Sequence, residues 1–589
     1  MPQTAMPDAN LPHYLANCDR NYDAAAALLA LPAAGPGYHS RLPAGTRAHP
    51  IRESLHYALG LLQAGGAAHN RRAAEIIAKV LSLQDTDPFH STYGVWPWYA
   101  DEPLAQMDPP DWNWADFCGA TLAQMLHDHA ALLPAGLVAK MREALGHAAW
   151  CIFRRNVRLD YTNIAIMGGG VAAVAGELLG EPRLLAFGRT RLERVMNLVR
   201  YHGSFTEYNS PTYTMVALEE SERVLHLAQD AGVRAAAEQL RQTAWQVIAE
   251  HFHPATQQWA GPHARAYANH LAPSLAHYLA QQTGVAIVPH GAGGGGAIMP
   301  RLVPGLPCPE AWRTRFTTLP QNPCELRTRF IRREDPDATP ADRFSSDTLV
   351  ERGTRPCPEQ RYGDRCGTTW FSAAATLGSC NHEDTWTQRR FLLGYLRTPE
   401  DAAVTLRLRF LHDGRDFASG FVRQAQGGPR VLSALTLLTD RGDWHPHFDH
   451  PADGVFPAED FRLRYELAGG GVRAVQLAAD RFELAAGDHR AIIHAPPGRF
   501  GAHAVRWECG QEDGRAFVDA VCYHGPRTGF PVAEICPVQV VGGLELLAPG
   551  QAPAPESVHL QAGADPGAFT AAWGGLQVEI TAPADLYPG

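Results

Sequence analysis

Hydrophobic residues recur at intervals of three and four over much of the first 290 residues. Segments 51–65, 137–153 and 184–201 show this spacing, and several such segments end in glycine. The spacing is typical of amphipathic α-helices, because it places the apolar side chains on one face. About ten helices in antiparallel pairs would form a bundle, a solenoid or an (α/α) toroid, and the lack of a fixed sequence period disfavours a simple solenoid.

After a glycine-rich stretch at 291–300, "GAGGGGAIMP", the hydrophobic period changes to two. In segment 403–414 apolar residues alternate with Thr and Arg, which is typical of a half-buried β-strand. Many short strands separated by Gly, Pro and Asp predict an antiparallel β-sandwich. The chain is therefore predicted to be a multidomain α and β protein. We expect an N-terminal (α/α) toroid over 1–290, a Gly-rich linker over 291–310, and a C-terminal antiparallel β-sandwich over 311–589.

Composition narrows the classes of partner. The chain has 589 residues, a net charge of −10 and a pI near 6.2, which argues against nucleic acid as the main partner. No uncharged apolar run is long enough to predict a membrane helix, so we expect no membrane partner. The 11 cysteines are odd in number and include no CxxC pair, and no signal peptide is visible. A cytoplasmic location is expected, and a periplasmic one stays open. Oligomeric state is not indicated.

The segment "HGSFTEYNSPTYT" at 202–214 combines polar and aromatic residues with a predicted helix start. Ser210 is a good N-cap and Pro211 a good first helical residue, which places Tyr213 in the first turn. The unpaired N–H groups there carry partial positive charge, which favours a phenolate. Tyr213 therefore suits the role of a general acid or base. The alternative is a tyrosine that packs, with its hydroxyl on a backbone partner.

Two further segments offer polar groups. In "DYTNIAIMGGG" at 160–170, Asn163 opens a predicted helix with its amide free to donate, or else serves as a simple cap. In "WAGPHARAYANH" at 259–270, an extended chain would place His263, Arg265 and Tyr267 on one face. A cation beside a phenol lowers the pKa of the phenol. The alternative is a surface turn with a solvated arginine.

The segment 93–117 is rich in tryptophan and proline and is not helical in pattern. Trp96, Trp98, Asp111 and Asn113 combine flat aromatic faces with hydrogen-bonding groups, as in many sugar-binding clefts. The alternative is aromatic packing of a long loop onto the helices.

Taken together, these segments resemble the heparinase II/III-like polysaccharide lyases, which are related to chondroitin AC and toroid-type alginate lyases. A similar stretch in that family reads D-G-S-x-x-E-Q-S-P-x-Y, and residues 202–213 here read H-G-S-F-T-E-Y-N-S-P-T-Y. Asn163 and Arg265 match the family's Asn upstream and Arg downstream. His202 replaces the usual Asp, and Tyr208 with Asn209 replaces a single Gln.

The resemblance implies a uronate-containing glycan or oligosaccharide as substrate and β-elimination as the reaction. Tyr213 would be the acid/base, Asn163 and a histidine would neutralise the uronate carboxylate, and Arg265 would lower the pKa of the tyrosine. No cofactor is required in this scheme. No motif identifies the histidine, so three are candidates. His202 is assigned to catalysis, and His263 and His382 are assigned to substrate binding with Glu207, Tyr208 and Tyr267.

One histidine-rich segment stands apart from these motifs. In "DWHPHFDH" at 443–450, His445, His447 and His450 could hold a structural metal, although an ordinary polar loop is the simpler interpretation.

Two other functions compete with the lyase. A glycoside hydrolase on a helical toroid would need two carboxylates about 5–10 Å apart, for which Glu102, Asp111 and Glu207 are candidates. A non-catalytic glycan-binding protein would keep the tryptophans but would not need Tyr213, Asn163 and Arg265 together.

Overall fold

A computed structural model describes residues 10–37, 39–290, 301–332, 363–382, 387–437 and 453–580. The glycine-rich stretch 291–300 of the predicted linker lies outside the described residues. So do the three candidate metal ligands His445, His447 and His450.

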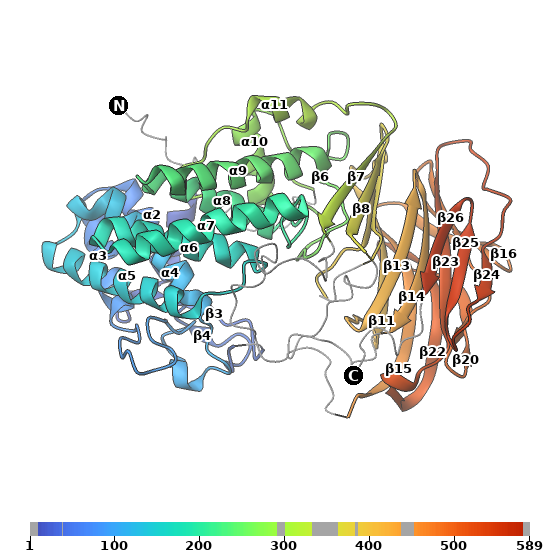
Figure 1. The fold of residues 1–589 in the computed structure, drawn as a ribbon, viewed down its shortest axis with the longest axis horizontal. Coiled ribbons are helices and arrows are strands. Elements are labelled where there is room, and N and C mark those ends of the chain that lie inside the picture. The colour runs from blue at the N-terminus through green and yellow to red at the C-terminus, as the bar shows by residue number, and fades with distance from the viewer. Residues whose placement is uncertain are drawn as a thin grey trace.

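The N-terminal part of the chain is helical (Figure 1). The helices are α1 (Leu11–Arg20), α2 (Ile51–Ala64), α3 (Ala67–Leu81), α4 (Asn113–His129), α5 (Ala135–Arg155), α6 (Thr162–Leu179), α7 (Pro182–His202), α8 (Tyr213–Leu227), α9 (Ala231–His251), α10 (Pro273–Thr283) and α11 (Glu310–Arg313). Short strand pairs join them: β1 (Tyr22–Asp23) with β2 (Leu28–Leu29), β3 (Leu31–Pro32) with β4 (Arg47–Ala48), and β5 (Phe252–His253) with β6 (Gln258–Trp259). Consecutive long helices lie side by side around one hydrophobic core.

Helix α6 is the central helix of this domain, and its glycines let neighbouring helices approach closely. A Cβ atom at Gly176 would lie 2.4 Å from the backbone nitrogen of Leu185. A Cβ atom at Gly188 of α7 would lie 2.4 Å from the nitrogen of Ala173. By length and composition α6 could cross a membrane, but 83% of it is buried inside the structure. That degree of burial is typical of a core helix.

Two antiparallel sheets follow. The first contains β7 (Cys324–Ile331), β8 (Arg365–Phe371), β9 (Ala375–Cys380), β10 (Leu392–Leu396), β11 (Val404–His412), β12 (Arg415–Asp416), β15 (Val455–Ala468), β21 (Arg506–Glu512) and β22 (Arg515–Pro531). Its strand order is β21-β22-β15-β11-β10-β9-β8-β7, and β12 pairs with β11. Strand β7 therefore forms one edge of this sheet.

The second sheet contains β13 (Gly420–Gly427), β14 (Arg430–Leu437), β16 (Val472–Ala478), β17 (Arg481–Ala486), β18 (His489–His494), β19 (Arg499–Phe500), β20 (His503–Ala504) and β23 (Val538–Leu547). Its main order is β13-β14-β23-β18-β17-β16, with β19 and β20 beside β23. A small sheet of β24 (His559–Ala562), β25 (Phe569–Trp573) and β26 (Leu576–Ile580) packs on β14 and β23.

The inward side chains of the two large sheets share one hydrophobic core. The predicted fold class, helical pairs of the (α/α) toroid type followed by an antiparallel β-sandwich, is confirmed.

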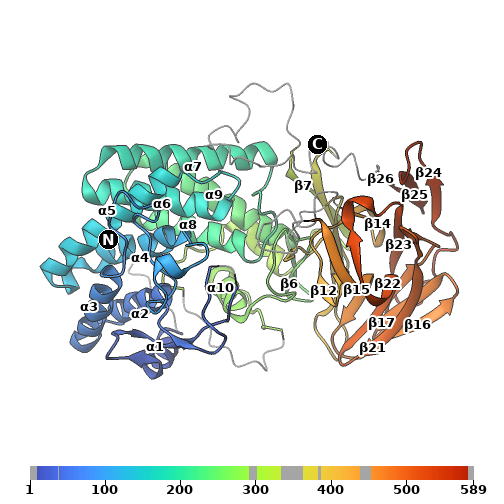
Figure 2. The ribbon, with the colours of Figure 1, turned by 90° about the horizontal axis from the view of Figure 1, so that it is seen from below.

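The segment after β6 joins the helices to the first sheet. His263 and Arg390 exchange two backbone hydrogen bonds of 3.0 and 2.8 Å, and Ala266 N–H donates to the Gln388 carbonyl at 2.8 Å. The sheet approaches so closely here that a Cβ atom at Gly378 would lie 1.9 Å from the Gly261 carbonyl oxygen. Figures 1 and 2 show β7 and β8 on the side of the sandwich nearest the helices. Segment 261–266 therefore lies at the junction of the two domains.

Candidate active site

The first turn of α8 is capped by Ser210. Its hydroxyl accepts from the backbone N–H of Tyr213 at 3.0 Å, and its carbonyl accepts from Thr214 N–H at 3.0 Å. These are the hydrogen bonds of an N-cap, as predicted. The helix itself begins at Tyr213, with Thr212 before it, rather than at Pro211. The hydroxyl of Ser210 donates in turn to the Arg265 carbonyl at 2.6 Å, which ties the helix start to the segment after β6.

Arg265 and Tyr267 lie over Tyr213. The guanidinium carbon of Arg265 is 4.3 Å from the centre of the Tyr213 ring, a cation–π contact. The hydroxyls of Tyr213 and Tyr267 are 2.8 Å apart. Tyr267 is 61% exposed, so the pair of hydroxyls is open to solvent on one side.

The direction of the pKa shift of Tyr213 corrects the sequence-based expectation. Burial raises the pKa of the phenol well above its ordinary value, and Tyr267 and Glu207 raise it further. Arg265 lowers the pKa, but less than burial raises it. Tyr213 is therefore a neutral phenol at neutral pH. In that state it can donate a proton, and it accepts one only after losing its own.

Asn163 meets Glu207 at the start of α6. The Asn163 amide Nδ2 donates to Glu207 Oε2 at 2.6 Å, and the Asn163 backbone N–H donates to the same oxygen at 3.1 Å. Arg265 Nη1 lies 3.3 Å from the other oxygen, Oε1. The expectation of a free Asn163 amide is therefore wrong for this structure, because the amide holds a carboxylate of the protein itself. An N-terminal helix turn with an amide and a guanidinium is a good carboxylate site.

The carboxyl of Glu207 is mostly buried. Burial raises its pKa, while Arg265 and Asn163 lower it by smaller amounts. The group is thus less acidic than an ordinary glutamic acid although two donors and a cation surround it.

Tyr161, two residues before Asn163, is hydrogen-bonded to the tryptophan-rich segment. Tyr161 OH accepts from Asn113 Nδ2 at 3.2 Å, and the negative charge of Glu207 adds to burial in raising the pKa of Tyr161 to about 12. Asp111 accepts from Asn113 N–H at 3.0 Å and from Trp98 Nε1 at 3.2 Å. Trp98, Asp111 and Asn113 are therefore joined to one another and to Tyr161 by hydrogen bonds, and their binding of a sugar stays a prediction.

Two predicted aromatic contacts lie elsewhere. Trp96 is fully buried and donates to the Val80 carbonyl at 3.0 Å, so it belongs to the helical core. Tyr208 is also fully buried and stacks on Phe330, with ring centres 4.4 Å apart. The burial of both rings leaves no face for a sugar, and their assignment to substrate binding is corrected.

The three candidate histidines are also buried, and each is held by the protein. Burial lowers the pKa of His202 to about 4, and its Nδ1 accepts from Arg332 N–H at 3.1 Å. Burial lowers the pKa of His263 to about 3, and its Nδ1 lies 2.5 Å from the Asn209 carbonyl. Burial lowers the pKa of His382 well below its ordinary value. The roles assigned to these histidines are corrected, because all three are buried groups with lowered pKa values, and His202 and His263 link the helices to the first sheet.

Three site residues were not singled out from the sequence. Tyr161 precedes Asn163 in the same motif, and its position at the helix start was the only signal. Thr206 shares a 2.5 Å hydrogen bond with Thr162 and joins the two loops. Gln388 accepts from Arg265 Nε at 2.8 Å and comes from the sandwich side of the junction. It lies 123 residues from Arg265, so no local pattern could reveal it.

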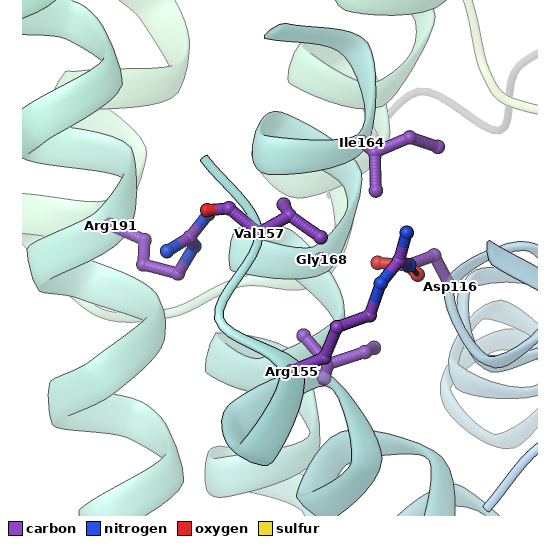
Figure 3. Close-up of a pocket in the computed structure, with 7 residues that line it drawn as sticks. Asp116, Arg155, Val157, Ile164, Gly168 and Arg191 are labelled. Carbon is purple, nitrogen blue, oxygen red and sulfur yellow. Dashed lines mark hydrogen bonds and ion pairs between the residues drawn. The ribbon is translucent and has the colours of Figure 1, made fainter. Parts of the chain in front are cut away.

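Asp116 of α4 is a buried acid beside α6 (Figure 3). It faces Gly168, where a Cβ atom would lie 2.5 Å from its Oδ1, and Arg155 Nη1 is 3.4 Å from its Oδ2. Burial raises its pKa to about 7, although Arg155 and Arg191 lower it. Asp116 lines a small pocket together with Ile164 and Val157, next to Gly168 of α6.

The chain thus consists of a helical domain followed by a β-sandwich. The cluster of Tyr213, Arg265 and Asn163 belongs to the helical domain, and Arg265 contacts Gln388 of the sandwich. A domain of unknown function, DUF8769, matches residues 13–285, which is less than half of the chain. No curated protein matches.

Among solved structures, the chain is similar to three that span most of its length. A crystal structure of heparinase III has 10% identity, a TM-score of 0.43, and coverage of 90% of this chain and 82% of that one. The structure of the Streptomyces coelicolor A3 chondroitin AC lyase in complex with chondroitin sulphate has 12% identity and a TM-score of 0.48, and the match covers 97% of this chain and 84% of that one. The structure of a Paenibacillus xanthan lyase has 10% identity and a TM-score of 0.38, and the match covers 92% of this chain and 57% of that one. All three TM-scores are below 0.5 and all three identities are below 25%, so these similarities assign no function to this chain.

Proposed function

We propose that this protein is a carbon–oxygen lyase that cleaves a uronate-containing glycan or oligosaccharide by β-elimination. The observation that carries the proposal is the contact of Tyr213 with Arg265 and Tyr267, beside a built carboxylate site. Asn163 and Arg265 already hold a carboxylate, which is the group that a uronate presents. The phenol that would move protons lies next to that site.

In the proposed reaction the C5–H and C4–O4 bonds break and a C4=C5 double bond forms. The electron pair of the C5–H bond becomes the double bond, and the electrons of the C4–O4 bond leave with O4. Tyr213 takes the C5 proton as a phenolate and returns a proton to O4, so the atoms balance at one side chain. Asn163 and Arg265 would neutralise the uronate carboxylate, which makes the C5 proton more acidic. The substrate carboxylate would therefore have to displace the carboxylate of Glu207 from Asn163 and Arg265. The scheme uses no histidine, metal or cofactor.

The test is ultraviolet absorbance during incubation with a panel of uronate glycans. Growth of the conjugated enoate band in the wild type, and its loss by at least about 1000-fold in Tyr213→Phe, would support the proposal. Tyr93→Phe is the matched control, because among the described residues the Tyr93 hydroxyl is hydrogen-bonded to His147 of α5 and not to Tyr213, Arg265 or Glu207. Wild-type turnover in Tyr213→Phe would overturn the assignment of Tyr213.

A glycoside hydrolase is the second candidate, and Glu207 is the observation that favours it. A mostly buried carboxyl with a raised pKa is suited to protonate a leaving glycosidic oxygen. New reducing ends without the enoate band, lost in Glu207→Gln, would establish this function instead of the lyase.

A further inference from the structure

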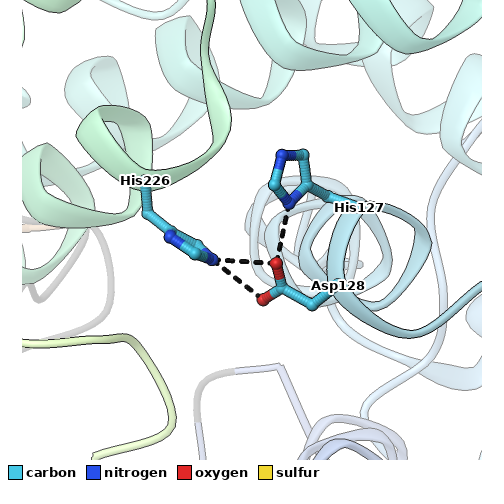
Figure 4. A group of neighbouring side chains, drawn as sticks. All are labelled: His127, Asp128 and His226. Atoms are coloured by element: carbon cyan, nitrogen blue, oxygen red, sulfur yellow. Dashed lines mark hydrogen bonds and ion pairs between the residues drawn. The ribbon is translucent and has the colours of Figure 1, made fainter. Parts of the chain in front are cut away.

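Three side chains at the far end of α8 form a group that the proposed function does not use. His127 and Asp128 lie in the last turn of α4, and His226 lies in the last turn of α8. His127 Nδ1 is 2.7 Å from Asp128 Oδ1, and His226 Nε2 is 2.8 and 3.0 Å from the two oxygens of Asp128 (Figure 4). Both imidazoles thus point a ring nitrogen at one carboxylate.

The donor set and its spacing suit a transition metal. One ligand atom from each residue lies within 4.8 Å of the others. A metal with bonds of about 2.0–2.2 Å to imidazole nitrogen and carboxylate oxygen fits among atoms at that spacing after small side-chain rotations. Imidazole with carboxylate favours zinc and similar divalent ions over magnesium or calcium. The three side chains are 31%, 18% and 32% exposed, so an ion can enter from solvent and keep water as a further ligand.

The helices that carry the ligands are fixed against each other one turn away. Arg223 of α8 donates to the side-chain oxygen of Gln124 of α4, and its Nε lies 3.0 Å from Glu220. Gln124 Nε2 also donates to the Leu302 carbonyl at 2.7 Å. All of these groups are buried or nearly so, so the register of α4 against α8 is set without any ion. The ligands therefore come from rigid elements, as in preorganised metal sites.

The electrostatics also favour a cation. Helices α4 and α8 both end at this place, and the unpaired carbonyls of a helix C-terminus carry partial negative charge.

We propose that His127, Asp128 and His226 bind a divalent transition metal of the zinc class, which joins the ends of α4 and α8. The site is separate from the cluster around Tyr213, because it lies at the opposite end of α8. Its role is structural: the ion adds a link between the last turns of α4 and α8, one turn beyond the contact of Arg223 with Gln124. The proposal does not depend on the proposed reaction.

The test is titration of the full chain, stripped with a chelator, with Zn²⁺ and separately with Co²⁺. We expect one ion per chain, a higher melting temperature with Zn²⁺, and visible absorption bands of bound Co²⁺. His226→Gln should weaken Zn²⁺ binding by about 100-fold or more, because even loss of a group that only orients a ligand costs about 10–100-fold. His90→Gln is the matched control, because His90 also faces two carboxylates, Asp85 and Asp87, but is not part of this group.

Each result decides the proposal. Tight binding that His226→Gln and His127→Gln abolish, and that His90→Gln leaves unchanged, supports it. No binding by the wild type, or equal binding by His226→Gln, overturns it. Circular dichroism of the metal-free variants shows whether they fold. If His226→Gln does not fold, His127→Gln decides in its place, and Co²⁺ bands that persist unchanged in that variant overturn the proposal.

Discussion

At the scale of single residues, two opposing effects act on Tyr213. The guanidinium 4.3 Å from its ring favours the phenolate, while burial disfavours any charge. Burial is the larger effect, because Arg265 is itself compensated by Glu207 at 3.3 Å. Arg265 therefore lowers the free energy of the Tyr213 phenolate, but the neutral phenol stays the main form at neutral pH.

The raised pKa of Tyr213 predicts how activity depends on pH. A base with a raised pKa is present in its active form only as a small fraction at neutral pH, and that fraction grows about tenfold per pH unit below the pKa. We expect kcat/KM on a uronate glycan to rise from pH 7 towards alkaline pH, up to the pH at which the protein unfolds. Initial rates by enoate absorbance check this, with circular dichroism at each pH as the control. A rate that falls above pH 7 in a folded protein would contradict it.

At the scale of elements, α6 and α7 show how glycine sets helix packing. Gly188 faces the backbone of α6 at Ala173 and Gly169, so the two helices touch without side chains between them. Side chains elsewhere could repack, but backbone atoms of two long helices have little freedom to move. The first turn of α6, which contains Asn163, is therefore positioned by contacts further along the same helix.

Gly188→Ala tests this packing. The added methyl group would lie 2.4–2.5 Å from backbone atoms, and we expect it to lower the free energy of unfolding by about 1–3 kcal/mol or more. Gly136→Ala is the control, because nothing lies within 4 Å of its Cβ position on α5. There the change should be neutral or stabilising by up to about 1 kcal/mol. Urea denaturation of both variants measures the difference, and equal stabilities would contradict the packing argument.

The sequence pattern predicts elements better than it predicts contacts. Amphipathic spacing predicts helices over 51–65, 137–153 and 184–201, and the structure has α2, α5 and α7 there. The N-cap role of Ser210 is local and was predictable. The pairing of Asn163 with Glu207 and of Arg265 with Gln388 depends on how loops from distant parts of the chain meet. The burial of His263 follows from the bridge to Arg390, which leaves no local signal.

At the scale of the whole molecule, buried histidines are common. Burial lowers the pKa of His56, His251 and His253 to about 4 and that of His263 to about 3. They lie in the helical domain and at its junction with the first sheet, so their neutral form is part of the packed core. Protonation of these groups is compatible with the unfolded chain but not with this core.

These histidines predict loss of stability in mild acid. Their pKa values are depressed in the folded state, so the stability they contribute is present above about pH 6.5 and is lost as pH falls towards 4. The slope should be on the order of 1 kcal/mol per pH unit for each such histidine within that window. Thermal unfolding between pH 7.5 and 4.5 measures it. A melting temperature that does not change from pH 6.5 to 5 would contradict the burial of these groups.

The carboxylate of Glu207 acts as a tethered ligand in the site that a substrate would occupy. Its local concentration is fixed by the fold, so it weakens the binding of any external carboxylate by a constant factor that no dilution of the protein can change. A single uronate offers the same group and little else, and we expect it to bind poorly. If the proposed function holds, a longer chain would gain contacts outside this subsite, for which Trp98 is a predicted residue, and would displace the internal carboxylate. The protein would then prefer longer chains over single uronates through this competition alone, without a binding pocket of matching length.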